Sequence, residues 1–272
     1  MIKMKTYLLG AIAGDMIGSP YESHRWRIKT TEFPLFQRFS RFTDDTVLTV
    51  ATMDCLLHGG KDYAAFYKKY ARKYPDAGFG KQFKGWMYAD NSLPYNSWGN
   101  GSAMRVSPVG WAFGTLDETL AAARASAEVT HNHPEGIRGA EAVAACIFLA
   151  RNGKTKDEIR EYVENTFGYD LRRTCREIRP TYRFDSSCQG SVPEAIICFL
   201  ESRDYEECVR LAVSLGGDSD TLAAIGGGIA EAYYRGVPEG IGRETLHRLP
   251  DEFLEVIRAF SEKYESISQR FV

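Results

Sequence analysis

The 272-residue sequence lacks long apolar runs, closely paired cysteines, internal repeats, low-complexity tracts and a large excess of charge of either sign. Its first 22 residues contain a short apolar run behind a charged start, but Asp15 interrupts that run. A helix that crosses a bilayer needs about 20 apolar residues. We therefore expect no membrane-spanning segment, and we interpret the start of the chain as a buried first helix rather than a signal peptide.

The cysteines and the charge balance argue against further classes of protein. None of the six cysteines belongs to a C-x-x-C pair, so the spacing of a redox or zinc site is missing. In a chain of this length we interpret them as reduced core thiols of a cytoplasmic protein. The formal net charge of −2 gives no general attraction to nucleic acid, so any such contact would have to be local.

The composition is that of a globular protein with a sizeable core. Hydrophobic residues make up 44% of the chain and charged residues 26%. The length is near the upper size for one hydrophobic core, and no stretch is rich enough in Gly, Ser or Pro to be a linker between domains. We therefore expect a single domain over residues 1–272.

Helical periodicity dominates the sequence. Gly10, Gly14 and Gly18 would line one face of a helix and let another backbone approach closely. Apolar residues at helical spacing, with caps or glycine stops, predict further helices over residues 43–57, 62–74, 117–128, 134–151, 156–167, 192–200, 205–215, 221–234 and 252–264. Residues 94–101 are rich in turn formers and predict a long loop. Weak strand patterns occur only near 31–39 and 181–184, so we predict an all-α fold.

Two acidic clusters stand at predicted helix starts. Thr43-Asp44-Asp45-Thr46 opens one helix, and Asp218-Ser219-Asp220-Thr221 opens another whose residues 222–234 are apolar nearly all round. Helix capping would explain one such residue per helix, worth about 1 kcal/mol. Four carboxylates beside a buried helix repel one another unless cations neutralise them. Carboxylate and hydroxyl oxygens are hard ligands, so the clusters predict a site for magnesium, manganese or calcium.

Two other metal motifs fit less well. An EF-hand loop starting at Asp218 would need glycine and glutamate where Ala223 and Ile229 stand. The aspartate motif of a metal-dependent phosphatase would follow a buried strand, whereas residues 208–215 have a helical pattern. A phosphatase or nucleotide hydrolase remains an alternative function because fold and function are only loosely tied.

The acidic clusters occur together with further motifs. The sequence contains GDMIGSPYE, FTDDTV, GNGSAMRVSPVGW, THNHPEG and SLGGDSDTLAAIGGGIAEAYY. In these segments, which run from about residue 10 to residue 234, the chain resembles the ADP-ribosylglycohydrolases, the family that includes the dinitrogenase reductase-activating glycohydrolases.

The resemblance implies a compact orthogonal helical bundle with two divalent cations, magnesium or manganese, at the bottom of an ADP-ribose cleft. The positions that match the family's metal ligands are Thr43, Asp44, Asp45, Asp218, Asp220 and Thr221. Glu22 matches a glutamate that some branches, including a serine-directed one, place at the metal centre and that others lack.

The resemblance also implies ADP-ribose contacts at Asn100, Gly101, Ser102 and His131. Glycines 99 and 101 would let backbone N–H groups approach a phosphate closely, although a lone Gly-Asn-Gly is more often a plain turn. A single histidine such as His131 is equally often a satisfied structural residue.

The implied reaction is hydrolysis of the glycosidic bond at the distal ribose, which reverses ADP-ribosylation. It needs carboxylates for an oxocarbenium-like transition state and a group that acts on water or on the leaving group, for which we expect Asp44 or Asp45. The target could be an ADP-ribosylated protein, a nucleic acid or a small molecule, with Glu22 favouring an O-linked one. A non-catalytic ADP-ribose-binding or structural relative is the alternative, but it would be expected to lose metal ligands.

Several other features have simpler structural interpretations. Gly226-Gly227-Gly228 lies inside a predicted helix and favours close packing. Asp15 is expected to bond backbone groups near its own turn, and His133 precedes Pro134 at a helix start and favours a structural role. Tyr88, Tyr95 and Trp98 are assigned no adenine contact, because aromatic residues near loops usually pack.

Overall fold

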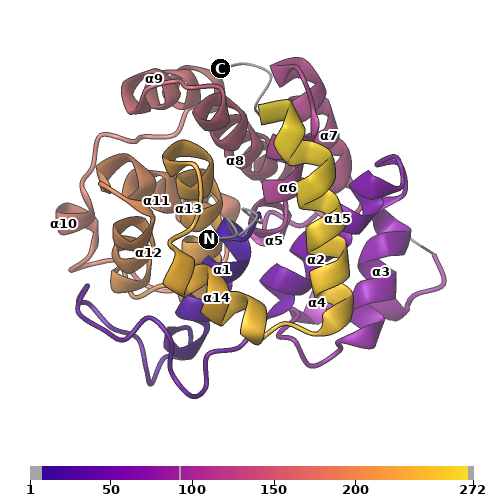
Figure 1. Cartoon of the computed structure of the whole chain (residues 1–272), viewed down its shortest axis with the longest axis horizontal. Coiled ribbons are helices and arrows are strands. Elements are labelled where there is room, and N and C mark those ends of the chain that lie inside the picture. Colours follow the sequence, from indigo (N-terminus) through magenta and orange to yellow (C-terminus); the bar gives the residue numbers. More distant parts are fainter. Residues whose placement is uncertain (1–7, 92, 269–272) are drawn as a thin grey trace, which may run out of the picture.

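The computed structural model describes residues 8–91 and 93–268, and over those residues it contains fifteen α-helices, one short 3-10 helix and no β-strand (Figure 1). The prediction of an all-α fold is confirmed. Within the same residues, one isolated antiparallel bridge joins Gly99 to Ser187.

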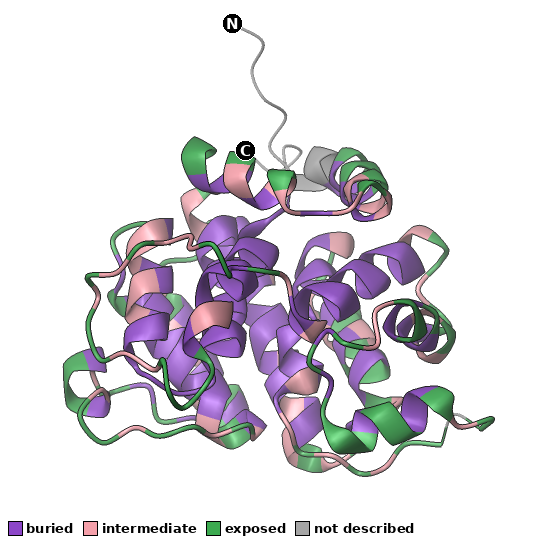
Figure 2. Ribbon diagram, turned by 90° about the horizontal axis from the view of Figure 1, so that it is seen from below, coloured by how far each residue is buried: buried purple, intermediate pink, exposed green. Residues whose placement is uncertain are grey.

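The helices pack around a buried central pair, α1 and α13, which lie inside the molecule (Figure 2). In chain order they are α1 (Gly10–Gly18), η1 (Ser19–Tyr21), α2 (Asp44–Leu57), α3 (Tyr63–Lys73), α4 (Lys81–Tyr88), α5 (Gly101–Met104), α6 (Ser107–Ala112), α7 (Leu116–Glu128), α8 (Pro134–Arg151), α9 (Lys156–Phe167), α10 (Cys175–Ile178), α11 (Cys188–Glu201), α12 (Tyr205–Ser214), α13 (Ser219–Tyr234), α14 (Glu239–His247) and α15 (Asp251–Ser268).

Glycines allow α1 and α13 to touch backbone to backbone. A Cβ atom on Gly14 would lie 2.0 Å from the carbonyl oxygen of Ala223, and one on Gly18 would lie 2.3 Å from the carbonyl oxygen of Ser219. From the other side, a Cβ on Gly227 would lie 2.5 Å from the carbonyl oxygen of Gly10. The predicted close packing of the first helix and of the Gly226–Gly228 run is therefore confirmed.

A buried carboxylate caps the start of α1. Glu231, from α13, accepts hydrogen bonds at 2.8 Å from the backbone N–H groups of both Leu9 and Gly10. Burial raises the pKa of Glu231 to about 7, against the lowering effect of these two bonds. The Tyr205 hydroxyl donates to the Gly10 carbonyl at 2.7 Å. These contacts prevent α1 from sliding along α13, in addition to holding the two helices together.

The remaining helices cover this pair in two groups. Helices α11 and α12 pack on α13, and α8 carries α6 and α7 and also touches α13. On the other side, α2 packs against α1, α3 and α15 (Figure 1). Because α1 touches both α2 and α13, it brings the starts of these two helices into one region.

The segment between η1 and α2 is an irregular loop, so the weak strand expected near residues 31–39 is wrong. Its backbone carbonyls are bonded by arginine side chains instead of by a neighbouring strand. Arg210 donates to the carbonyls of Thr31 and Phe33, and Arg248 donates to those of Gln37 and Ser40. Charged donors can satisfy extended backbone without a sheet.

The weak strand expected near residues 181–184 is also wrong. Tyr182 lies in a turn in which its N–H donates to the Ile178 carbonyl, and its carbonyl accepts from the Lys29 ammonium at 2.8 Å. The structure also adds α4, α5, α6, α10 and α14, which the sequence did not predict. These helices are at most nine residues long, and helices so short depend on tertiary packing rather than on intrinsic propensity.

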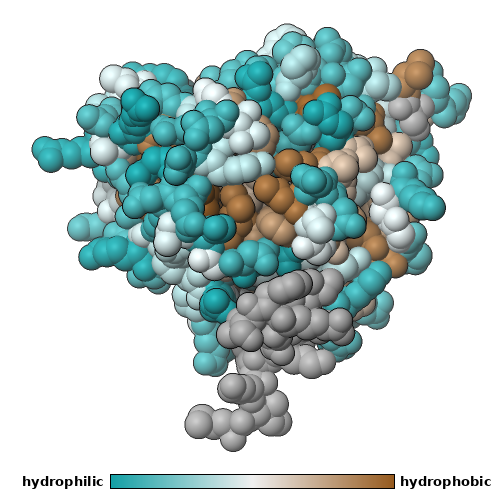
Figure 3. Space-filling model, turned by 90° about the horizontal axis from the view of Figure 1, so that it is seen from above, coloured by the Kyte–Doolittle hydropathy of each residue, from teal (hydrophilic) through white to brown (hydrophobic). Residues whose placement is uncertain are grey.

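Apolar side chains are mostly inside, as the composition predicts. Figure 3 shows one face of the molecule, on which hydrophilic side chains surround smaller groups of apolar ones. The large hydrophobic residues that are exposed are Trp26, Phe39, Tyr88, Leu93, Trp98 and Phe184. Among the described residues, no helix combines the length and the hydropathy that crossing a membrane requires.

The glycine contact predicts a large difference between two Gly→Ala substitutions. Gly14→Ala forces a side chain into the α13 backbone and is expected to lower the free energy of unfolding by about 3 kcal/mol or more. Gly85→Ala, in α4, meets no atom within 4 Å and should raise stability by about 0.5–1 kcal/mol. Urea unfolding measures both, and equal effects of the two substitutions would contradict this account of the core.

The Glu231 carboxyl predicts a pH dependence. Its folded pKa of about 7 lies above the ordinary 4.5, so the folded protein binds a proton more tightly than the unfolded chain. This contribution to stability is complete below pH 4.5 and is lost as the pH rises to 7. The unfolding free energy of wild type minus that of Glu231→Gln should therefore fall by up to about 3 kcal/mol as the pH rises from 4.5 to 7. A constant difference would show that the carboxyl is not perturbed.

Candidate metal centre and cleft

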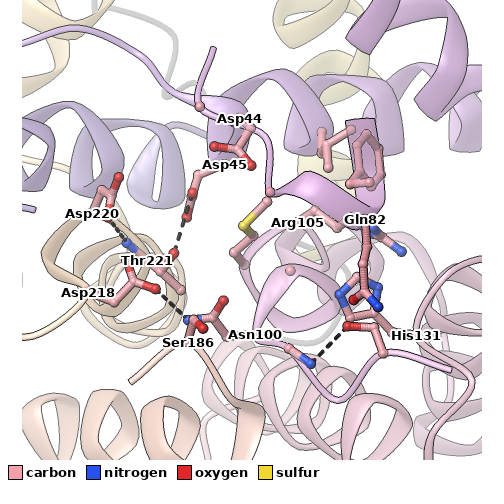
Figure 4. Close-up of a pocket in the computed structure, with 18 of the residues that line it drawn as sticks. Asp44, Asp45, Gln82, Asn100, Arg105, His131, Ser186, Asp218, Asp220 and Thr221 are labelled. Atoms are coloured by element: carbon pink, nitrogen blue, oxygen red, sulfur yellow. Dashed lines mark hydrogen bonds between the residues drawn. The ribbon is translucent and has the colours of Figure 1, made fainter. Parts of the chain in front are cut away.

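The starts of α2 and α13 open into a cavity of about 490 Å³ (Figure 4). The loop that leads into α5 forms another part of its wall, and the start of α4 contributes Lys81 and Gln82. This volume is in the range of cavities that hold small ligands.

Asp15 organises the start of α2. Its carboxylate accepts from the Thr43 N–H at 2.9 Å, from the Thr43 hydroxyl at 2.8 Å and from the Thr46 N–H at 3.1 Å. The expectation that Asp15 bonds its own turn is therefore wrong. The close approach of α1 to its neighbours places this buried carboxylate against orphan N–H groups of another helix, which it can satisfy.

The two acidic helix starts touch each other through their hydroxyl residues. The Thr221 hydroxyl donates to Asp45 Oδ2 at 3.4 Å, and the Thr43 hydroxyl lies 3.3 Å from the same oxygen. Asp218 is held from the α5 side, where the Asn100 amide donates to Asp218 Oδ2 at 2.8 Å (Figure 4). Side chains about 175 residues apart in the chain therefore share one wall.

Carboxylate oxygens gather here in two groups of three. In one group, oxygens of Asp15, Asp45 and Asp220 lie within 4.8 Å of one another, and in the other those of Glu22, Asp218 and Asp220 do. Asp220 belongs to both groups. Asp45 Oδ1 is buried and has no hydrogen-bond partner among the described residues. Two adjacent oxygen-rich groups with an orphaned ligand atom fit hard divalent cations.

The protein alone does not favour ionisation of these acids. Burial, and then the charges of neighbouring carboxylates, raise the pKa values of Asp45 and Asp220 well above their usual range. Burial and the charge of Asp15 raise the pKa of Asp44 to about 8. Partial burial and the charges of Asp218 and Asp15 raise the pKa of Glu22. Such a cluster binds protons or cations to relieve its repulsion.

Comparison with known proteins places this arrangement in a family. The family model of the ADP-ribosylglycohydrolases matches residues 3–269. The chain belongs to the ADP-ribosylglycohydrolase family. The resemblance drawn from the sequence motifs is thereby confirmed.

Relatives of the family span most of the chain. ADP-ribosylhydrolase ARH3 of Mus musculus is 28% identical over 84% of this chain and 82% of its own length. ADP-ribosylarginine hydrolase Tri1 of Pseudomonas putida is 24% identical over 98% of this chain and 77% of its own. A solved structure described as an ADP-ribosylglycohydrolase-related protein complex superposes with a TM-score of 0.69 and 26% identity, covering 94% of this chain and 96% of that one.

Six of the seven predicted metal ligands of this ADP-ribosylglycohydrolase line the cavity, whereas Thr43 lies behind it with its hydroxyl against Asp45. Asp44 lines the cavity but belongs to neither three-carboxylate group. Glu22 lies on the loop after η1, and its carboxylate reaches Asp218 and Asp220. Thr43, Asp45, Asp218, Asp220 and Thr221 are buried together.

Only some of the predicted ADP-ribose contacts line the cavity. Asn100, Gly101 and His131 line the cavity. Ser102 does not line it, because its side chain is fully buried and its hydroxyl donates to the Gly136 carbonyl at 2.6 Å. His133 instead caps α8, where it accepts from the Glu135 N–H at 3.1 Å, which is the structural role expected for it.

Sequence reasoning missed several side chains that face this site. Asp15 had a usable signal, an acid within a run of small apolar residues that become wholly buried. Gln82, Phe184 and Ser186 had none, because the helix and turns that carry them are set by tertiary packing. Arg105 stood inside a quoted motif, but nothing in the sequence marked it as buried.

The shared position of Asp220 predicts how stability responds to metal. In EDTA, Asp220→Asn should unfold at the same or a higher temperature than wild type, because it removes a buried charge that is not compensated. Manganese at about 100 times its dissociation constant should stabilise wild type by about 2.7 kcal/mol but not the variant. Asp157→Asn, at an exposed carboxylate on α9, is the matched control and should keep the full metal response. A full response in Asp220→Asn would argue against a cation between the two groups.

Proposed function

We propose that this protein is a metal-dependent hydrolase that cleaves the glycosidic bond between the distal ribose of ADP-ribose and a modified target. The observation that carries the proposal is the meeting of two acidic helix starts, which share Asp220, in one cavity of an ADP-ribosylglycohydrolase. A relative that only binds ADP-ribose has no need to keep so many mutually repelling carboxylates.

Two divalent cations, magnesium or manganese, fit the chemistry of these ligands. Thr43, Asp44, Asp45, Asp218, Asp220, Thr221 and Glu22 would hold them. Bound there, such ions polarise sugar hydroxyls and lower the pKa of water. The orphaned Oδ1 of Asp45 supports this proposal from the protein side.

The side chains of the cleft would have different roles in the reaction. Asp44 faces the cavity and stands outside both three-carboxylate groups, so its carboxylate can meet substrate or water there. It is therefore suited to give a proton to the leaving group or to take one from water. Asp45 is the alternative for this role. The surrounding carboxylates stabilise positive charge that develops on the sugar.

The rest of the cleft would hold the ADP part of the substrate. Gly101 has no side chain there, so its backbone N–H can approach a diphosphate, whereas the N–H groups of Gly99 and Asn100 already donate to Ser97 and Ser186. We propose Asn100, Gly101 and His131 as ADP-ribose contacts, together with Ser102 through its backbone. Asn100 would also orient the carboxylate of Asp218, to which it is bonded.

The modified target can be a protein, a nucleic acid or a small molecule. Glu22 stands in one of the two carboxylate groups, and this placement supports an O-linked target first. The relationship to Tri1, named as an ADP-ribosylarginine hydrolase, keeps an arginine linkage among the substrates to be tested. The six cysteines are free and buried, which supports a cytoplasmic location.

The deciding experiment measures release of free ADP-ribose from serine-, arginine- and nucleobase-linked substrates, with magnesium or manganese and then with EDTA. Metal-dependent release from one substrate supports the hydrolase and identifies its linkage. Release of orthophosphate instead would favour a metal-dependent phosphatase. If manganese binds but no substrate is cleaved, the result would favour a non-catalytic relative that binds ADP-ribose or has a structural role.

Two isosteric substitutions probe the assigned roles. Asp44→Asn and Asp220→Asn should each lower turnover by about 100-fold or more while helicity measured by circular dichroism is unchanged. Asp157→Asn removes an exposed carboxylate outside the cleft and should turn over like wild type. Wild-type rates in either cleft variant would refute the proposed site.

A further inference from the structure

Arg105 has the largest fully buried side chain of the described residues and follows α5 in the wall of the cleft. Its guanidinium lies 4.1 Å above the Tyr67 ring, and Nη2 donates at 2.8 Å to the Ser126 carbonyl and to the Thr130 hydroxyl. No acidic side chain of the described residues lies within 4.0 Å of it. A buried cation without a carboxylate partner is expensive, so a function for it is worth seeking.

The Thr130 hydroxyl connects Arg105 to the cleft. It has two hydrogen-bonding partners, Arg105 Nη2 at 2.8 Å and His131 Nδ1 at 2.7 Å. A threonine hydroxyl has one hydrogen to donate and two lone pairs to accept with. Arginine can only donate, so Arg105 always occupies one of the two lone pairs.

The hydrogen count then favours one tautomer of His131. If Thr130 gives its hydrogen to Nδ1, every one of these groups is satisfied. If Nδ1 carried the hydrogen, it would donate to the second lone pair, and the buried Thr130 hydroxyl would have no acceptor for its own hydrogen among the described residues. The positive charge of Arg105 also favours a lone pair rather than an N–H on the side of the ring that faces it. Both arguments place the ring hydrogen on Nε2.

Nε2 faces the cleft. His131 and Gly101 both line the cavity, and a Cβ on Gly101 would lie 3.0 Å from Nε2, so the glycine leaves the space in front of this nitrogen open. Within the described part of the chain, the ring's hydrogen bond is made by Nδ1. Burial and the charge of Arg105 hold the pKa of His131 well below its usual range, so the ring is neutral.

We propose that Arg105 and Thr130 are positioning residues that fix His131 as the neutral Nε2–H tautomer and so present one hydrogen-bond donor to an oxygen of bound ADP-ribose. The ligand part of this inference rests on the proposed function, whereas the tautomer does not. A neutral donor fixed in this way recognises an oxygen acceptor without giving up a proton to it.

Nitrogen-15 NMR of histidine-labelled, metal-free protein tests the tautomer, with His131→Gln to assign the signals. Wild type should show the Nε2-protonated pattern at His131. Thr130→Val keeps the shape of the side chain and removes its hydroxyl, so the Nδ1 signal should move because the hydrogen bond that Nδ1 accepts is lost, and calorimetry should find ADP-ribose binding weaker by about 3- to 10-fold. Thr119→Val, which removes an equally buried hydroxyl bonded to its own helix, should change neither.

An Nδ1–H pattern in wild type would overturn the proposal, and so would an unchanged Nδ1 signal in Thr130→Val. If Thr130→Val does not fold, Thr130→Ala, which also removes the hydroxyl, replaces it, and the Nδ1 signal should again move. Absence of ADP-ribose binding by wild type would count against the proposed function, while the spectra would still decide the tautomer.

Discussion

The backbone contact between α1 and α13 is the constraint on which the rest of the molecule depends. Gly14 and Gly18 let α1 lie directly against the first turns of α13, with no layer of side chains between them. Asp15 therefore sits beside the carboxylates that begin α13, and its own bonds to Thr43 bring in the start of α2. A single large side chain at this contact would separate the two acidic helix starts.

Because these elements lie so close together, their carboxylates repel one another, and the fold itself does not neutralise this repulsion. Asp15, Asp45, Asp218 and Asp220 are buried close together, and helix N-termini and hydroxyl groups offset only part of their repulsion. The bonds that the Thr43 and Thr221 hydroxyls make to Asp45 Oδ2 are long, at 3.3 and 3.4 Å, and Oδ1 has no partner among the described residues, so lone pairs of Asp45 are available. The protein thus accepts a local instability that a bound cation removes, which is a common relation between stability and function.

The motifs of the sequence predicted the helical class, the central glycine contact and the acidic centre, because each depends on local spacing and residue chemistry. The structure differs from the prediction where residues distant in the sequence determine the local conformation. Residues 31–39 had a strand-like pattern, but arginines from α12 and the end of α14 bond carbonyls of this segment, including those of Thr31 and Gln37. Helix α11 starts at Cys188, earlier than expected, because Ser187 caps it and Pro193 is tolerated inside it. Ser102 matched a ligand position, yet its hydroxyl is bonded to α8.

The cleft also differs in charge from one end to the other, as Figure 4 shows for the labelled residues. Carboxylates of α2 and α13 occupy one end, whereas Arg105, His131 and Gln82 lie at the other. A ligand with a polyol at one end and anionic phosphates farther along would place its hydroxyls near cations and its phosphates away from the acids. Reversing that ligand would set phosphate against carboxylate, so the charge distribution alone favours one orientation. The unpaired Arg105 then contributes to orientation through its field, in addition to its bond with Thr130.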